Sequence, residues 1–276
     1  LHSGSLVDHF RPIWAGYYSA VENIIGNGGI IVPLLDPDHQ LTATTMETRT
    51  HHTDGPAAEI VGTWSEAPTA FATPSDLSDP EKYQGCIPFV DLNGSDEGIS
   101  FADNAYWTHG DGSSADTAFS IGGWVNVSAV GLAFISKYNS NPNIEYELRL
   151  HTGNNLFFRM FDNSSGIYIG RTSSGGELTL NQWHFVTMTY SGNEANSGIN
   201  LYIDASVVDD ADSANGSYAA MHDTTATFTI GGADYGYQTA GKIAGGPLAP
   251  FSTRSELSTY DVGRLYNLGK RALGLM

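Results

Sequence analysis

The feature that most constrains this chain is a series of short alternating segments between Thr117 and Ile230. Each segment alternates apolar and polar residues, and Gly, Asn, Asp or Ser residues separate it from the next. Alternation with a period of two is the pattern of a strand that buries one face. Many such strands joined by turns favour two antiparallel sheets packed face to face. The sequence therefore predicts an all-β fold, an antiparallel β-sandwich.

Composition narrows the range of partners. Of the 276 residues, 41% are hydrophobic and 15% are charged, which suits a globular domain with its own core. Lys and Arg together number 12 against 30 Asp and Glu, so the formal net charge is −18. Such a chain has no basic cluster, and we expect it to bind neither nucleic acid nor an anionic membrane.

Cysteine content and hydropathy bear on the compartment. Cys86 is the only cysteine, so no intrachain disulfide forms, and this suits assembly in a reducing cytosol. No apolar run approaches the ~18 residues that a membrane-spanning helix needs. The segment from Leu1 to Arg11 mixes His, Asp, Arg and Ser, and it does not have the pattern of a signal peptide.

Apolar residues recur at helical spacing near the beginning of the chain. We expect a helix over residues 6–25, with Asp8 as its N-cap and Pro12 in its first turn. The glycine-rich run at 26–29 ends it. Its large apolar face must pack on the sandwich or on a neighbouring subunit, and the residues expected there are Phe10, Trp14 and Tyr17.

A second helix is expected over residues 252–273. Thr253 and Glu256 have the spacing of a capping box, and positive residues near its end complement the helix dipole. Leu265 and Leu268 lie on its apolar face, and they too are expected to dock on the sandwich or on a partner.

The segment 36–86 is mostly irregular, and we interpret it as a long loop insertion before the main sandwich at 87–246. Its Asp36 and Asp38 are candidate Ca²⁺ ligands, and Ca²⁺ is the one cofactor that the residues suggest. The acidic run at 209–212 is an alternative Ca²⁺ site. The cluster at 51–54 (HHTD) is more typical of a solvated loop than of a transition-metal site.

Two hairpins can be read from their turns. Residues 89–101 are expected to reverse at Asn93–Asp96, and residues 146–160 at the turn 152–155. In the second hairpin the apolar residues alternate with Glu145, Glu147 and Arg149. We interpret the face with Glu147 and Arg149 as a solvated sheet surface.

Taken in order, these segments resemble the strands of LamG-like, concanavalin A-like jelly-roll domains. The matching segments are FSIGGWV at 119–125, ISKY at 135–138, QWHFVTMTY at 182–190, NLYID at 200–204 and FTIGG at 228–232. Upstream, residues 30–35 resemble the first strand of such domains and residues 89–96 resemble an early hairpin. The resemblance implies one LamG-like domain over 1–276, a jelly roll with a helix at each end and an N-terminal arm at 1–29.

The chain departs from that family at the last strand. Members commonly carry acids there that help to hold a structural Ca²⁺, whereas this chain has IAGGPL at 243–248. The form of this segment, followed by a helix, resembles members found among tailed-phage structural proteins. That resemblance implies a place in a virion.

Relatives of this fold include glycosidases, which need two carboxylates on either side of the scissile bond. The nearest candidate pair is Glu145 and Glu147, and the third acid of an E-x-D-x-E pattern is replaced by Arg149. No nucleophile elbow, phosphate loop or dinucleotide fingerprint occurs in a suitable context. We therefore expect no enzymatic activity.

Carbohydrate binding needs aromatic rings that stack on sugars and polar groups that hydrogen-bond their hydroxyls. Two clusters have this composition: Tyr106 and Trp107 with His109 and Asp111, and Asp234, Tyr235 and Tyr237. The same aromatic residues would also suit packing at the rim of the sandwich.

The function expected from these observations is that of a non-enzymatic virion structural protein, in capsid decoration or in a tail. Its partners would be other virion proteins, further copies of itself as a homo-oligomer, and surface glycans. The alternative is a secreted or cell-surface carbohydrate-binding module with an extracellular location. A glycosidase is the third hypothesis.

Overall fold

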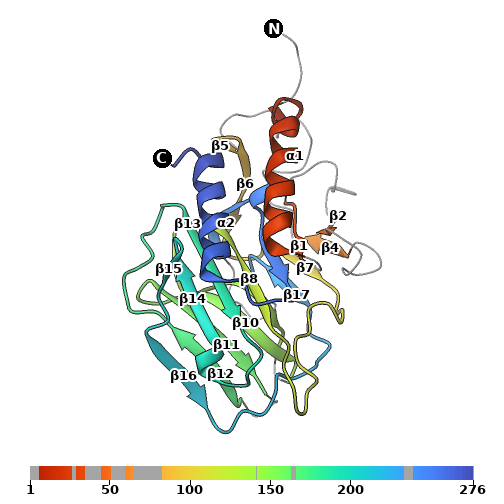
Figure 1. The fold of residues 1–276 in the computed structure, drawn as a ribbon, viewed down its shortest axis with the longest axis vertical. Coiled ribbons are helices and arrows are strands. Elements are labelled where there is room, and N and C mark those ends of the chain that lie inside the picture. Colours follow the sequence, from red (N-terminus) through yellow and green to blue (C-terminus); the bar gives the residue numbers. More distant parts are fainter. Residues whose placement is uncertain are drawn as a thin grey trace.

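The architecture follows from strands that bury one side each. The computed structural model describes residues 6–26, 29–34, 45–50, 60–64, 83–140, 142–162, 166–232 and 239–275. Two antiparallel sheets stack face to face, and the helices α1 (Leu6–Ile25) and α2 (Thr259–Ala272) stand side by side at one end (Figure 1). This confirms the predicted sandwich with a helix toward each end.

The first sheet has its long strands at its centre. Its order is β15 (Ser206–Val207), β14 (Ile199–Ile203), β13 (His184–Tyr190), β8 (Phe119–Val127), β18 (Ala240–Ala244), β6 (Ile87–Asn93) and β5 (Tyr83–Gln84). A branch from β8 adds β19 (Phe251–Thr253), β1 (Ile30–Ile31) and β3 (Arg49–Thr50).

The second sheet packs against the first. Its order is β16 (Ala211–Asn215), β12 (Tyr168–Thr172), β11 (Asn155–Phe161), β10 (Ile144–His151), β9 (Leu132–Tyr138), β17 (Phe228–Ile230), β7 (Ile99–Phe101), β4 (Val61–Trp64) and β2 (Thr45–Glu47). Two short 3₁₀ turns, η4 (Asn196–Gly198) and η5 (Gly246–Leu248), complete the described elements.

The core lies between the sheets, and the helices add an apolar layer outside the first sheet. Every residue of β13 is buried, because one side faces the second sheet and the other lies under α2. Val21 of α1 and Leu265 of α2 meet Trp124, Phe185 and Phe251 in this outer layer. A strand buried on both faces no longer needs polar residues at every second position.

The hairpin 146–160 forms as expected, with His151 opposite Asn155 next to its turn. The expected hairpin over 89–101 does not form: β6 belongs to the first sheet and β7 to the second. The connecting turn is held by Glu97, whose carboxylate accepts a hydrogen bond from the Asn93 amide at 2.6 Å. The chain therefore crosses between layers at this turn.

Three expectations about element boundaries were wrong. The segment 36–86 is not one loop, since it supplies β2, β3, β4 and β5. Asp8 and Pro12 lie inside α1, which already begins at Leu6. Proline removes only one backbone donor, and packing of the apolar face sustains the helix around it.

The second helix begins later than expected. Thr253 belongs to β19, where its hydroxyl donates to the Ile25 carbonyl at 2.8 Å. The N-cap is Ser258, whose side chain accepts a hydrogen bond from the Asp261 amide. Ser258 with an acid three residues later caps the helix in the way expected of Thr253 and Glu256, but five residues further along the chain.

Candidate functional site

Tyr106 and Trp107, expected to be exposed for sugar binding, are core residues. Tyr106 is 4% exposed and its hydroxyl donates to the Ser252 carbonyl at 3.1 Å. Trp107 has no exposed surface and stacks on Phe228 with ring centroids 4.0 Å apart. The prediction that these two residues bind carbohydrate was therefore wrong, since a buried ring face cannot stack on a sugar.

The side chains of His109 and Asp111, close to these two residues in sequence, make contacts within the protein. His109 is buried and stacks on Phe119 at 3.9 Å, and burial lowers the pKa of its imidazole well below the ordinary value. Asp111 is exposed, and its carboxylate accepts backbone hydrogen bonds from Ser113, Ser114 and Ala115 in one turn. Both side chains therefore contribute to folding this loop.

The remaining acidic and aromatic candidates have separate outcomes. Asp36, Asp38, Asp234, Tyr235 and Tyr237 lie outside the described residues, so their roles stay predictions. In the 209–212 run, Arg171 pairs with both Asp209 and Asp212, and Asp210 accepts from the Ser174 amide at 2.7 Å. Across the described part of the chain, no group of three or more His, Cys, Asp or Glu side chains could hold a metal ion.

The acids of β10 do not form a glycosidase pair. Glu145 is fully buried, and one of its carboxylate oxygens accepts hydrogen bonds from Lys137 and from Thr224. Lys137, equally buried, also lies 2.9 Å from Asp103. Burial raises the pKa of the Glu145 carboxyl to about 6 against the opposing attraction of Lys137.

The face with Glu147 and Arg149 is not a solvated surface. Glu147 is 2% exposed and accepts a hydrogen bond from Arg159 at 2.5 Å, with Arg149 at 3.6 Å on the same oxygen. The guanidinium of Arg159 covers the Phe161 ring at 4.7 Å. The carboxylate is therefore neutralised by two arginines and shielded by aromatic residues.

The apolar helix faces pack within this chain. Trp14 and Leu265 are buried in the main core, and Phe10, Tyr17 and Leu268 pack against it while partly exposed. Trp14 also donates from its indole nitrogen to the Cys86 carbonyl at 2.8 Å. The first of the two expected docking surfaces, the sandwich itself, therefore accounts for most of these contacts.

The outer face of the first sheet is hollowed beside α2. Two adjoining hollows of about 490 Å³ and 270 Å³ share Asn126 and Asn181, and together we term them the amide groove. The groove extends from α2 across the end of β8 to β18 and β6. Its polar and aromatic lining residues are Gln84, Asp91, Asn93, Trp124, Asn126, Ser128, Asn181, Gln182, Trp183, Lys242, Tyr266 and Lys270.

Three strands and one turn set the geometry of this groove. Lys242 of β18 lies directly opposite Asp91 of β6 and Asn126 of β8, so the three outward residues form a row. Asn181 has a φ of 60°, and its backbone amide donates to the Val127 carbonyl at 2.8 Å. Asparagine tolerates this left-handed conformation, which holds the turn before β13 against the end of β8.

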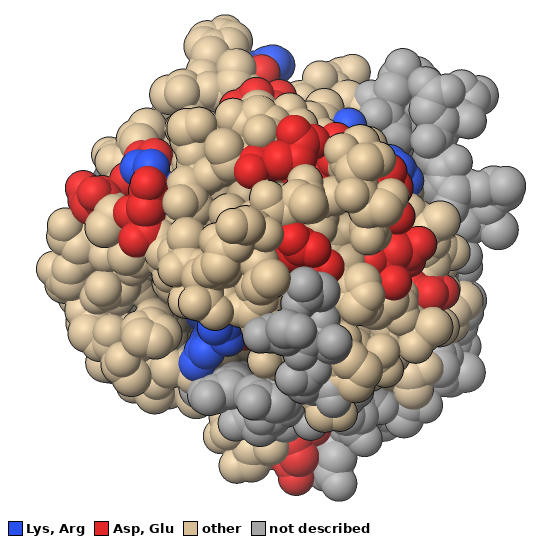
Figure 2. Space-filling model, turned by 90° about the horizontal axis from the view of Figure 1, so that it is seen from below, with Lys and Arg blue, Asp and Glu red and all other residues tan. Residues whose placement is uncertain are grey.

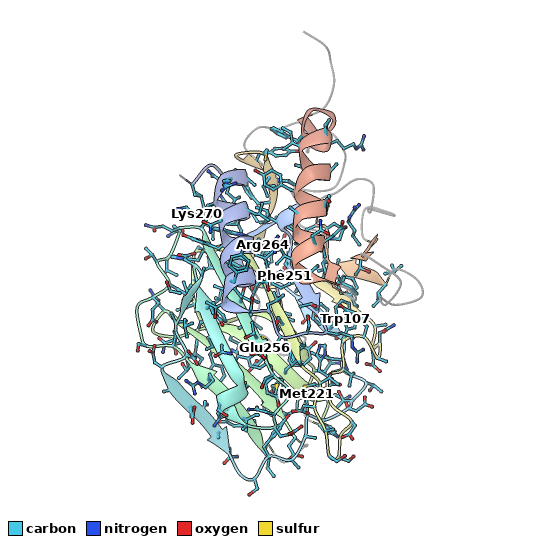
Figure 3. All side chains as sticks on the ribbon, viewed as in Figure 1. Trp107, Met221, Phe251, Glu256, Arg264 and Lys270 are labelled. Carbon is cyan, nitrogen blue, oxygen red and sulfur yellow. The ribbon has the colours of Figure 1, made fainter. Side chains whose placement is uncertain are left out.

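Aromatic rings form the other wall of the amide groove. Tyr266 stacks on Trp124 with centroids 5.6 Å apart and an interplanar angle of 11°. Trp183, half-buried, meets the edge of Phe89 at 6.1 Å. Lys270 lies on the side of α2 away from α1 (Figure 3), with its ammonium 5.6 Å from the Tyr266 ring.

Three of the five side-chain amides that line this groove are available to a ligand, whereas Gln84 and Asn93 hydrogen-bond to the protein. Within the described residues, the side chains of Asn126, Asn181 and Gln182 make no hydrogen bond to the protein. Each amide offers two donors and one acceptor. Aromatic surface beside unpaired amides is the composition that binds a molecule bearing both apolar faces and hydroxyl groups.

Sequence reasoning missed this site for a physical reason. Trp124 and Trp183 were assigned to strands, and the amides stand at strand ends and turns that are distant in sequence. Only the pairing of β8 with β18, and the position of α2, bring them together. A weak signal was present: Asn181-Gln182-Trp183 places two amides beside an aromatic residue.

Two sheets with crossovers between them, covered at one end by two helices, define a β-sandwich of the concanavalin A-like type. Residues 101–245 match the family model of the concanavalin A-like lectin/glucanases superfamily, so the chain belongs to that superfamily. A search of curated protein sequences gives no match.

Solved structures with the same fold have low sequence identity to this chain. A structure described as HCR/D-Sa-GBL1/C is 14% identical, with a TM-score of 0.55, over 90% of this chain and 52% of that one. A structure of botulinum neurotoxin type C, whose cell entry is described as dependent upon interaction with two ganglioside molecules, is 13% identical. Its TM-score is 0.51, over 83% of this chain and 51% of that one. Domain 4 of the Geobacillus stearothermophilus arabinanase AbnA, in complex with arabinotriose, is 17% identical. Its TM-score is 0.44, over 65% of this chain and 81% of that one. The chain thus spans about half of the first two, and the likeness is one of fold.

Proposed function

We propose that this protein is a non-enzymatic carbohydrate-binding module that holds a saccharide in the amide groove. The observation that carries the proposal is the set of unpaired amides beside Trp183 and Tyr266. A sugar ring would stack on Trp183 while its hydroxyls exchange hydrogen bonds with Asn126 and Asn181. Concanavalin A-like membership supports it, as does a similarly folded toxin described by its interaction with gangliosides.

The lining of the groove supports binding without hydrolysis. Asp91 is the one carboxylate among the described residues that line it, and glycoside hydrolysis needs two. Elsewhere, Glu145 pairs with buried Lys137 and Glu147 pairs with half-buried Arg159. A carbohydrate-binding role suits an extracellular location.

A glycan array and calorimetry test this proposal. The wild-type chain is expected to retain a set of related glycans, and Trp183→Ala or the double change Asn126→Ala/Asn181→Ala is expected to lose them. Tyr260→Ala is the matched control, because Tyr260 is an aromatic residue of α2 with 74% exposure outside the groove. Equal retention by all variants, or no retention by the wild type, would refute the proposal.

A second candidate is a virion structural protein in capsid decoration or in a tail, with other virion proteins as partners. The observation that favours it is a second hollow, between α1 and α2, on a surface separate from the amide groove. Mass spectrometry of purified virus particles tests this candidate, because a structural component is present at a fixed copy number. Absence of the chain from all particles would exclude it.

A further inference from the structure

The two helices enclose a groove of their own. It has a volume of about 430 Å³, and we term it the helix groove. Ala20 and Ile24 of α1 line one side, and Arg264, Asn267, Leu268 and Arg271 of α2 line the other. Figure 3 shows Arg264 on the side of α2 nearer α1, whereas Lys270 lies on the opposite side.

Helical spacing arranges these residues in two rows. Ala20 and Ile24 are four apart, and Arg264, Leu268 and Arg271 follow at intervals of four and three, so each set lies on one helix face. Leu268 stands between the two arginines along α2. With a rise of about 1.5 Å per residue, the arginines are separated by about 10 Å along α2.

The groove is positively charged in an acidic protein. Arg271 has no carboxylate partner among the residues that the structure describes. Within the described part of the chain, Arg264 pairs only with Asp261, at 3.4 Å, and its side chain is 44% exposed, so the guanidinium keeps most of its capacity for another acid. At physiological salt, charges beyond about 8 Å are screened, so a bound segment responds to these arginines more than to the net charge.

Hydrogen bonds from the turn between β5 and β6 tie both helices of the groove to the sandwich. Cys86 accepts the Trp14 indole hydrogen bond at its carbonyl, and its own amide donates to the Ala272 carbonyl at 3.0 Å. One residue of the sandwich therefore fixes both helices. A preformed groove avoids the ordering cost that weakens binding to flexible surfaces.

We propose that the helix groove docks an acidic amphipathic helix of a partner protein. Its apolar side chains would lie on half-buried Ala20 and Leu268, and carboxylates seven residues apart would pair with Arg264 and Arg271. A third helix laid between two helices completes ordinary helix packing. The inference gives the partner chemistry of the surface that favours the second candidate function, and it holds for a partner inside or outside a virion.

Fluorescence anisotropy with two labelled synthetic helical peptides tests this on the full chain. One peptide carries Glu residues seven apart with Leu residues between them, and the other carries Lys in place of Glu. The acidic peptide is expected to bind at least about tenfold more tightly to the wild-type chain. In Arg264→Glu/Arg271→Glu, with a far-UV circular dichroism spectrum like that of the wild type, the preference is expected to reverse toward the Lys peptide.

The control variant is Lys242→Glu, which changes one charge in the amide groove and is expected to leave both peptide affinities unchanged. Equal binding of the two peptides, no binding of either, or an unreversed preference overturns the proposal. Self-association in sedimentation velocity that Arg264→Glu/Arg271→Glu abolishes also overturns it, because the occupant is then a second copy. If the chain is found in virus particles but shows no preference for the acidic peptide, only this inference is refuted. If it shows neither particle association nor a peptide preference, the second candidate function is refuted as well.

Discussion

Lys137 is a cation without exposed surface, and its surroundings explain how the sandwich tolerates it. Its ammonium lies between the Glu145 and Asp103 carboxylates and donates to the Thr224 carbonyl at 3.1 Å. A buried charge is costly unless it is paired and hydrogen-bonded. The second oxygen of Glu145 is buried and has no hydrogen-bond partner among the described residues, so this carboxylate is only half satisfied there.

The Glu145 carboxyl is expected to make stability depend on pH. Its folded-state pKa of about 6 exceeds the ordinary value of 4.5, so the folded chain holds a proton that the unfolded chain has released. The resulting stabilisation is complete below pH 4.5 and is lost as the pH rises through 6, by about 2 kcal/mol. The difference in unfolding free energy between the wild type and Glu145→Gln, measured by urea denaturation from pH 4.5 to 7, should show this fall, because the opposing titration of buried His109 is common to both proteins. The exposed Glu256→Gln serves as control, and an unchanged pH profile in Glu145→Gln would contradict the assignment.

At the scale of an element, α2 depends on two glycines with different surroundings. A Cβ on Gly269 would collide with the indole nitrogen of Trp124, whereas a Cβ on Gly263 would meet nothing within 4 Å. The close approach of Gly269 lets Tyr266 stack on Trp124 and so shapes one wall of the amide groove. The first glycine is needed for packing, and the second only lowers helix propensity.

These glycines give opposite expectations for the same substitution. Gly263→Ala should stabilise the protein by about 0.5–1 kcal/mol through helix propensity. Gly269→Ala should destabilise it by about 1–3 kcal/mol, because α2 must move away from β8. Denaturant titration of both variants checks the signs. Stabilisation by Gly269→Ala would mean that α2 does not approach Trp124 as described.

The elements that the sequence predicted well are those with strict alternation. The hairpin 146–160 could be predicted because its turn and its inward residues agree. The start of α2 could not, since Thr253-x-x-Glu256 and Ser258-x-x-Asp261 are both good caps, and only the pairing of β19 with β8 decides between them. The role of Trp107 could not be predicted either. A loop residue that packs into the core has the same local sequence pattern as one that is exposed to solvent.

At the scale of the whole molecule, negative charge dominates the surface. Seen from the end opposite the helices, carboxylates are spread over the face and few Lys or Arg residues accompany them (Figure 2). This agrees with the formal charge of −18. The two described helices lack the combination of length and hydropathy that a bilayer span requires.

Self-repulsion of this charge should make stability depend on salt. The melting temperature is expected to rise between 10 mM and 200 mM NaCl, because screening weakens repulsion in the compact state. Each kcal/mol gained corresponds to about 2–4 °C for a chain of this size. Calorimetry in KCl should give the same rise, and a fall in melting temperature would contradict the explanation. A larger rise in CaCl₂ at matched ionic strength would indicate Ca²⁺ binding.

The site was less predictable than the fold. Its strands follow from local alternation, but the amide groove needs Asn126, Lys242 and Tyr266 to meet from three separate segments. Unpaired amides on a surface have no sequence pattern of their own. An asparagine that binds a ligand differs from a solvated one only in the residues that surround it in the folded structure.

The position of Trp14 has a consequence for synthesis. This residue of α1 packs beside Gly246, and Thr253 hydrogen-bonds the end of the same helix at Ile25. The ribosome adds about 5–20 residues per second, so α1 waits on the order of tens of seconds for these contacts. During that interval the part of the apolar face of α1 that packs on η5 and β19 has no partner in the nascent polypeptide. A chaperone that shields α1 until β19 emerges would meet a need that the finished molecule no longer shows.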